Sequence, residues 1–84
     1  MPEVKDAAEA VRLAKKYARE MSEWFFWGSV IESSYDEEHK VWRVVFTAAT
    51  GLLAPYRTYE VLIDATTGAL KEFRRLDSHE GRGR

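Results

Sequence analysis

The residue types that could catalyse a reaction are few in this chain, and they lie in segments without apolar periodicity. Asp77, Ser78 and His79 are the residue types of a hydrolytic triad, but they are adjacent in the sequence. A triad depends on a spatial geometry that rigid elements impose. We expect residues 77–84 to form a flexible C-terminal tail, because they have no apolar pattern. The sequence therefore predicts no catalytic residue there.

Two histidines and a run of acids are the remaining groups that could bind a metal or transfer a proton. Asp36, Glu37 and Glu38 directly precede His39, whereas His79 lies in the expected tail. Paired carboxylates catalyse reactions only when a site holds them apart and shifts their pKa values. Adjacent acids between two strands are typical of a solvated turn. A metal site needs several converging ligands, and neither histidine has them at a recognisable spacing. We predict no metal, no cofactor and no enzymatic activity.

The composition indicates one small domain without obvious nucleic-acid or membrane chemistry. The chain has 84 residues, no cysteine and a formal net charge of −1. A nucleic-acid-binding domain would show a basic excess, and no apolar run approaches the ~20 residues of a membrane-spanning helix. Residues 1–6 are polar and lack the apolar core of a signal peptide. We therefore expect no nucleic-acid partner, no membrane insertion and, by default, a cytoplasmic location.

Residues 2–24 show the periodicity of one amphipathic helix. Apolar side chains recur at spacings of three and four residues, and charged side chains occupy the opposite side. Alanine is so frequent in the apolar stripe that we expect close approach to a flat partner such as a sheet. Gly28 is expected to end the helical region. The stripe consists of Val4, Ala7, Val11, Ala14, Ala18, Met21 and Phe25, widened by Leu13, Tyr17 and Trp24.

Four segments after the helix have the alternating pattern and the bounding turn residues of strands. We expect strands over residues 29–35, 41–49, 57–64 and 69–76. Successive side chains of a strand point to opposite faces, so the two middle strands each have an apolar face. The side chains expected to face the helix are Trp42, Val44, Phe46, Tyr59, Val61 and Ile63.

The sequence from Asp64 to Gly68 predicts a tight turn between the last two strands. Asp64 can accept hydrogen bonds from backbone N–H groups about two residues ahead, and Gly68 can adopt the positive φ that closes a short hairpin. Strands joined by short connections are antiparallel neighbours. We therefore predict one α+β domain over residues 1–76, with an N-terminal amphipathic helix packed on a four-stranded antiparallel sheet in the meander order α-β-β-β-β.

With this order of elements, the chain resembles the PepSY domain family. The resemblance rests on the alanine-rich helix, on the strand from Trp42 to Phe46, and above all on the segment from Tyr59 to Leu70. That segment is similar to the family's Y-x-V-x-hydrophobic-D-x-x-T-G-x-hydrophobic signature. The resemblance covers most of residues 5–75. It implies a small module without catalytic residues, associated with secreted or membrane-attached proteins and with the inhibition or regulation of peptidases. The chain departs from the family in showing no signal or anchor segment.

An aromatic run is the first candidate surface for a partner. Residues 24–27 are four aromatic residues in a row, and they cannot all face one core from the end of a helix. In one interpretation Trp24 and Phe25 enter the core while Phe26 and Trp27 cover the edge of the sheet. In the other, the run is an exposed aromatic anchor for a partner.

The sheet face turned away from the helix is the second candidate surface. An antiparallel sheet with one solvated face should carry polar residues there, but Val45 and Leu62 interrupt that pattern. We expect them to form an apolar contact centre, with Arg43 and Glu60 as its polar rim. The candidate partner-binding residues are Arg43, Val45, Glu60, Leu62, Phe26 and Trp27.

The sequence therefore predicts a non-catalytic protein-binding domain that forms a homodimer, and the resemblance implies a PepSY-like regulator of a peptidase or of another partner. The alternative is a small-ligand-binding or enzymatic subunit with a pocket between the helix and a curved sheet. We do not favour it, because no acid–base or metal-binding set reaches one face. A third class binds nucleic acid through exposed aromatic residues beside a basic patch, for which Arg43 and Arg57 alone give little support.

Overall fold

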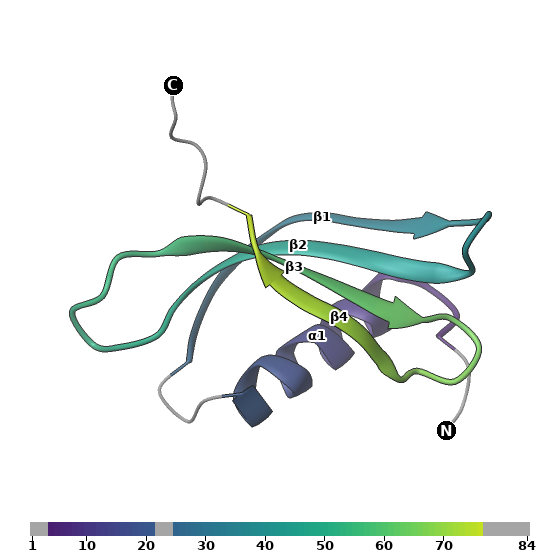
Figure 1. The fold of residues 1–84 in the computed structure, drawn as a ribbon. Coiled ribbons are helices and arrows are strands. Elements are labelled where there is room, and N and C mark those ends of the chain that lie inside the picture. Colours follow the sequence, from purple (N-terminus) through teal and green to yellow (C-terminus); the bar gives the residue numbers. More distant parts are fainter. Residues whose placement is uncertain (1–3, 22–24, 77–84) are drawn as a thin grey trace.

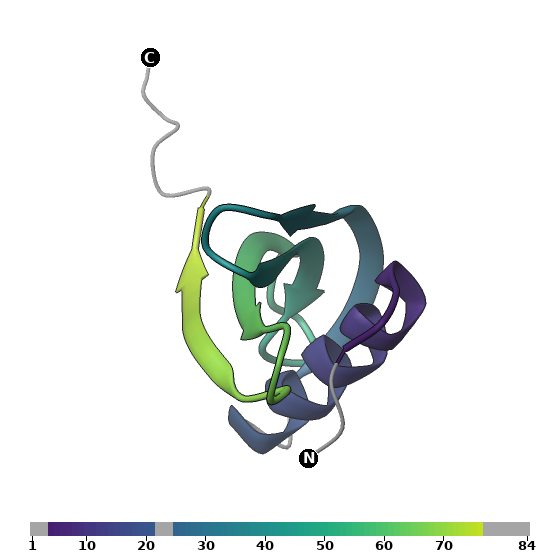
Figure 2. The same cartoon turned by 90° about the vertical axis from the view of Figure 1, so that its right-hand side faces the viewer.

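One helix packs against one face of a four-stranded antiparallel sheet. The computed structural model describes residues 4–21 and 25–76. The strand order in the sheet is β1-β2-β3-β4, with the helix on one side of a strongly twisted sheet (Figures 1 and 2). The predicted α+β fold and its meander order are confirmed. The elements are α1 (Ala7–Met21), β1 (Phe26–Asp36), β2 (Val41–Ala49), β3 (Arg57–Asp64) and β4 (Leu70–Arg75).

The helix begins later than the sequence predicts. Asp6 Oδ1 accepts a hydrogen bond of 2.8 Å from the Glu9 backbone N–H, and Glu9 Oε1 accepts one of 3.1 Å from the Lys5 N–H. These bonds satisfy N–H groups that the first helical turn leaves unpaired, so α1 starts at Ala7. Residues 4–6 form a non-helical arm before it. Residues 2–3 and 22–24 of the expected helix, and the expected tail at 77–84, lie outside the described residues.

The alanine stripe lets α1 lie close to the sheet. Ala10, Ala14 and Ala18 are spaced by four residues and are 0–1% exposed. Small side chains at these positions leave room for larger ones from the sheet, as close packing requires. Met21 was expected in the stripe but is 59% exposed. The largest fully buried side chains all come from the two central strands, as predicted: Phe46, Ile63, Val44 and Val61.

The first strand begins at Phe26, three residues before its predicted start. Gly28 therefore lies inside β1 and does not end the helix, and Phe25 lies outside the helix. The β1–β2 register is irregular between Trp27 and Val30. A Cβ atom at Gly28 would clash with Thr47 Oγ1 and lie 2.8 Å from the Thr47 carbonyl oxygen. Glycine is needed here because the two backbones approach closely.

Aromatic rings fill the space between the helix and the sheet. The Trp27 ring stacks on Phe46 with 4.2 Å between ring centroids, and Phe25 contacts Phe46, Tyr59 and Phe73 at 5.3–6.4 Å. Ring pairs at such distances stabilise beyond the area that they bury. The interior of the domain is thus a packed aromatic cluster, next to the alanine stripe of α1.

The turn between β3 and β4 has the predicted chemistry. Asp64 Oδ1 accepts hydrogen bonds from the Thr66 and Thr67 N–H groups at 2.8 and 3.0 Å. Gly68 has a φ of 80°, which favours glycine. The Tyr17 hydroxyl donates a 2.5 Å hydrogen bond to the Gly68 carbonyl oxygen, so the turn is also fastened to α1. The amides of Thr67 and Thr66 hold the pKa of Asp64 below its usual value.

We expect Gly28→Ala to destabilise the protein by about 1–3 kcal/mol, because the added methyl group overpacks the contact between β1 and Thr47. Urea unfolding at neutral pH measures this change. Gly51→Ala is the matched control, since a Cβ there would meet only Ala54 at 3.6 Å, an ordinary contact. Equal stability of the two variants would contradict this description of β1.

Candidate functional site

The sheet face turned away from the helix brings together four of the six predicted partner-binding residues. Arg43 pairs with Leu62, and Val45 pairs with Glu60, across the central strands β2 and β3. Their exposure differs from the expected arrangement: Val45 is 5% exposed and Glu60 is 3% exposed. A charged group therefore occupies the centre of this face, and Val45 offers almost no area to a partner.

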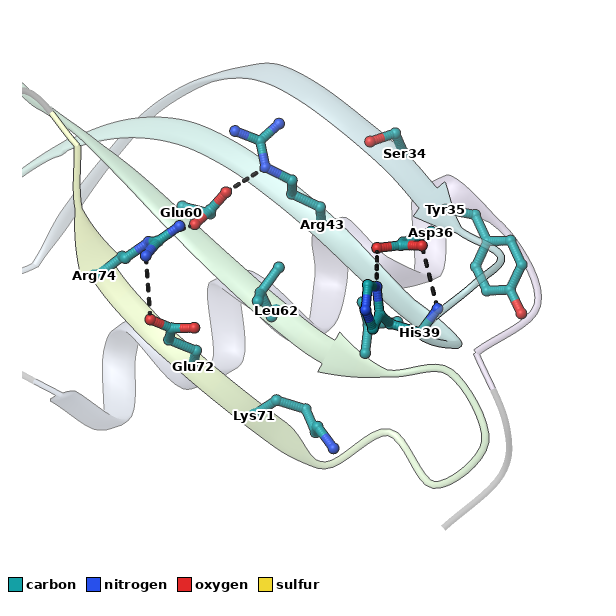
Figure 3. A pocket seen from close by; sticks show the side chains of 11 residues that line it. Ser34, Tyr35, Asp36, His39, Arg43, Glu60, Leu62, Lys71, Glu72 and Arg74 are labelled. Atoms are coloured by element: carbon teal, nitrogen blue, oxygen red, sulfur yellow. Dashed lines mark hydrogen bonds and ion pairs between the residues drawn. The ribbon is translucent and has the colours of Figure 1, made fainter.

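Glu60 is held between two arginines from neighbouring strands (Figure 3). Arg43 Nε on β2 donates to Glu60 Oε2, and Arg74 Nε on β4 donates to Glu60 Oε1 at 2.6 Å. Each arginine also reaches an outer carboxylate: Arg43 Nη1 lies 3.0 Å from Glu32 on β1, and Arg74 Nη1 lies 3.4 Å from Glu72. These five side chains form an ion ladder that crosses all four strands.

The ion ladder keeps Glu60 ionised although the side chain is buried. Burial by itself would raise the pKa of Glu60, but the hydrogen bonds and charges of Arg43 and Arg74 outweigh it, and the pKa is lowered. The hydrogen bond that Arg43 donates to Glu60 also raises the pKa of Arg43. A carboxylate with a lowered pKa holds no proton at neutral pH, so Glu60 is poorly suited to be a general acid.

A shallow depression of about 560 Å³ lies over this face. Val41 and Leu62 are among its apolar residues, and Arg43, Glu60 and Arg74 line it from three adjacent strands. In the ion ladder these charges neutralise one another, which leaves little charge to select a ligand. The space between helix and sheet, where the alternative function needed a pocket, holds the aromatic cluster.

The turn between β1 and β2 gathers three potential metal ligands, which the sequence spacing had not indicated. The ligand atoms of Asp36, Glu38 and His39 lie within 4.8 Å of one another. Asp36 already accepts bonds from the Glu38 and His39 amides at 3.0 and 3.2 Å and contacts the His39 ring at 2.8 Å. The hydrogen bond to the His39 side chain is the main reason that the pKa of Asp36 is lowered. These hydrogen bonds within an exposed turn explain why the three side chains lie close together.

Strand alternation separates the two aromatic candidates, Phe26 and Trp27. Trp27 stacks in the core on the helix side, so it is not an exposed anchor. Phe26 points the other way and is 37% exposed.

The loop between β2 and β3, which lies at one end of the domain (Figure 1), carries exposed apolar side chains. Leu52 and Leu53 in that loop are 82% and 96% exposed, and Tyr56 is 58% exposed. Phe26 pairs with Ala49 beside the loop. We call this surface the apolar end and define it by Phe26, Leu52, Leu53 and Tyr56.

Sequence analysis identified only part of the apolar end. Leu52 and Leu53 stand out as apolar residues in a loop, and Phe26 was a candidate from the aromatic run, but Tyr56 was not identified. The signal that could have identified the loop is its composition, because residues 50–56 contain no charged side chain.

Comparison of the chain with protein-family models, with curated proteins and with solved structures finds no match. The resemblance to the PepSY family has no support from these comparisons and stays a hypothesis. Within residues 4–21 and 25–76, no helix combines the length and the apolar character needed to cross a membrane.

We expect Glu60→Gln to lower the free energy of unfolding by roughly 1–3 kcal/mol, because it leaves two arginines facing a neutral amide. The range allows for the partial exposure of both arginines, which weakens their ion pairs. Glu72→Gln is the matched control, since Glu72 is 46% exposed and has one longer ion pair. Chemical denaturation at pH 7 compares the variants. A Glu60→Gln protein as stable as the control would contradict the ion ladder.

The stability that Glu60 provides should depend on pH in a defined direction. Its folded pKa is depressed, so its ionisation stabilises the fold fully above the unfolded value of about 4.3. That contribution is lost as the pH falls through the folded pKa. The stability difference between wild type and Glu60→Gln should therefore shrink when the pH is lowered from 7 to 3. A difference that is constant or grows on acidification would be inconsistent with a lowered pKa.

Proposed function

We propose that this domain is a non-catalytic protein-binding module that associates with a second copy of itself through the apolar end. The observation that carries the proposal is the exposure of Leu52 and Leu53, at 82% and 96%. Scattered surface hydrophobes are ordinary, but here two leucines lie next to further exposed apolar residues at one end of the molecule. A concentrated apolar surface is typical of an interaction site.

Self-association fits the charge of this end better than binding to a strongly charged partner. A two-fold interface brings the same patch of both copies together, so it must be complementary to itself. Residues 50–56 carry no charge, and two copies of that loop do not repel each other. Burying leucine side chains then supplies the favourable free energy, at about 25 cal/mol per Å².

The small size of the apolar end limits the strength of the dimer. Standard protein interfaces bury about 800 Å² on each partner, and four side chains supply less than that. We therefore expect a dimer that forms at micromolar to millimolar protein concentration, not an obligate one.

Catalysis or ligand binding in the depression over the ion ladder is the rival function. The ion ladder argues against it, since the charges that could act on a substrate are held in pairs. Peptidase regulation, which the PepSY resemblance implies, remains a prediction. Titration of the isotope-labelled protein with candidate peptidases tests it, and unchanged amide shifts throughout would count against it.

We expect the double variant Leu52→Ser, Leu53→Ser to be monomeric at concentrations where the wild type self-associates. Both side chains are exposed, so the substitution removes contact area between copies without opening the core. Light scattering coupled to size exclusion, over a dilution series into the high micromolar range, measures the mass.

Ile31→Ser is the matched control, because Ile31 on β1 is exposed to 59% and does not belong to the apolar end. It should leave the association unchanged. A wild type that is monomeric throughout the series would overturn the proposed dimer. If self-association persists in the double variant but is lost in Ile31→Ser, the interface lies at the edge of β1 and not at the apolar end.

A further inference from the structure

A second, smaller groove lies at the end of the domain opposite the apolar end, where the N-terminal arm meets two turns (Figure 1). It has a volume of about 360 Å³, near the lower limit of about 300 Å³ for small-molecule sites. Its walls come from four segments that are distant in sequence: the arm, the end of β1 with its turn, the start of β2, and the turn after β3. The side chains of interest are Lys5, Tyr35, Lys40, Trp42 and Thr66.

Three hydrogen bonds fix the frame of this groove. The Val4 N–H donates to the Ala65 carbonyl oxygen at 2.8 Å, and the Trp42 indole N–H donates to the Val4 carbonyl oxygen at 3.1 Å. The Ala65 N–H donates to the Lys40 carbonyl oxygen at 3.0 Å. The arm, β2 and both turns are therefore tied to one another around the cavity. A frame that is ordered before a ligand arrives lowers the entropy cost of binding.

The charge of the groove has one sign. None of its lining residues is acidic, and two of them are lysines. Among the residues that the structure describes, Lys5 and Lys40 form no ion pair. Asp36 lines the depression over the ion ladder and does not line this groove, whereas Tyr35 lines both. The Thr66 side chain adds a hydroxyl group that can donate to an anion.

Lys40 has a backbone conformation that a lysine adopts at a cost. Its φ is 58°, and no other non-glycine residue of the described chain has a positive φ. Glycine would fit this turn position more easily. Strained residues of this kind concentrate at functional sites, and Lys40 is one of the residues that line the groove.

Aromatic rings supply the remaining wall. Tyr35 and Trp42 are in contact, with 5.3 Å between ring centroids and 47° between ring planes. Tyr35 is 43% exposed, so part of its ring is available to a ligand. A flat apolar surface beside two ammonium groups suits a molecule that has a ring next to an anionic group.

We propose that this groove binds a small organic anion, whose carboxylate or phosphate lies between Lys5 and Lys40 and whose apolar part lies against Tyr35. The site is independent of the apolar end and does not rest on the proposed self-association. Lys5 and Lys40 act as charge partners through their ammonium groups, and the Thr66 hydroxyl donates a hydrogen bond to the anion.

The test is an NMR titration of the isotope-labelled full chain with phenyl phosphate, benzoate, inorganic phosphate and neutral benzyl alcohol. We expect saturable shifts of the Lys40 and Thr66 amides and of the Trp42 indole N–H with at least one ring-bearing anion, and none with benzyl alcohol. Comparing phenyl phosphate with benzoate distinguishes a phosphate ligand from a carboxylate ligand. Weak shifts without saturation, or equal shifts with benzyl alcohol, would overturn the proposal.

Two variants distinguish binding of the anion in the groove from non-specific attraction to positive charge on the surface. Lys40→Gly removes the ammonium group while glycine accepts the positive φ, so the fold should persist and binding should weaken about tenfold, as loss of one charged partner predicts. Lys71→Met removes a lysine that lines only the other depression, and binding should be unchanged. Equal binding by wild type and Lys40→Gly, or equal losses in both variants, would contradict the assignment.

Discussion

The alternation of side chains along β2 and β3 is the constraint on which the rest of the structure depends. In each strand, one set of residues points toward α1 and the other set points away. The first set forms the aromatic and aliphatic core against the alanine stripe. The second set includes Arg43 and Glu60, which start the ion ladder. A register slip of one residue would exchange the two sets, placing Glu60 in the aromatic core and Phe46 in solvent.

The same alternation separates the surfaces of the domain. At the end of β1, Tyr35 contacts Trp42 and lines both the groove and the depression over the ion ladder, while Asp36 lines only the depression. The groove with Lys40 has no acidic residue in its wall, although three acids precede Lys40 closely in the sequence. At the start of β1, Trp27 enters the core and Phe26 remains partly exposed. The two ends therefore differ in chemistry: the loop of residues 50–56 at one end carries no charge, whereas the turns at the other end are charged.

Much of the fold follows from the sequence because the patterns in the middle of the chain are unambiguous. The bounds predicted for the strands 41–49 and 57–64 agree with β2 and β3 to the residue. The aromatic run at residues 24–27 was harder to assign to an element, since its pattern fits the end of a helix as well as the start of a strand. The start of α1 was missed although Asp6 and Glu9 have the spacing of a capping pair, because the apolar stripe extends back to Val4.

The sites were less predictable, because they depend on register and on contacts between distant segments. The sequence placed Arg43 and Glu60 on one face as the polar rim of a contact surface, but only the pairing of β3 with β4 adds Arg74 and explains why Glu60 is buried. The groove with Lys5 and Lys40 requires the N-terminal arm to reach the turn at Ala65. A helix starting at residue 2 would not have placed the arm there.

The most direct test of the central claim, that copies of this domain meet through the apolar end, is a search for contacts between copies by NMR. A mixed sample of labelled and unlabelled protein at millimolar concentration isolates nuclear Overhauser effects that cross the interface. Our account predicts such effects from the Leu52 and Leu53 methyl groups to protons of Tyr56 or Phe26 in the second copy. Intermolecular effects confined to other surfaces, or none at all, would contradict it.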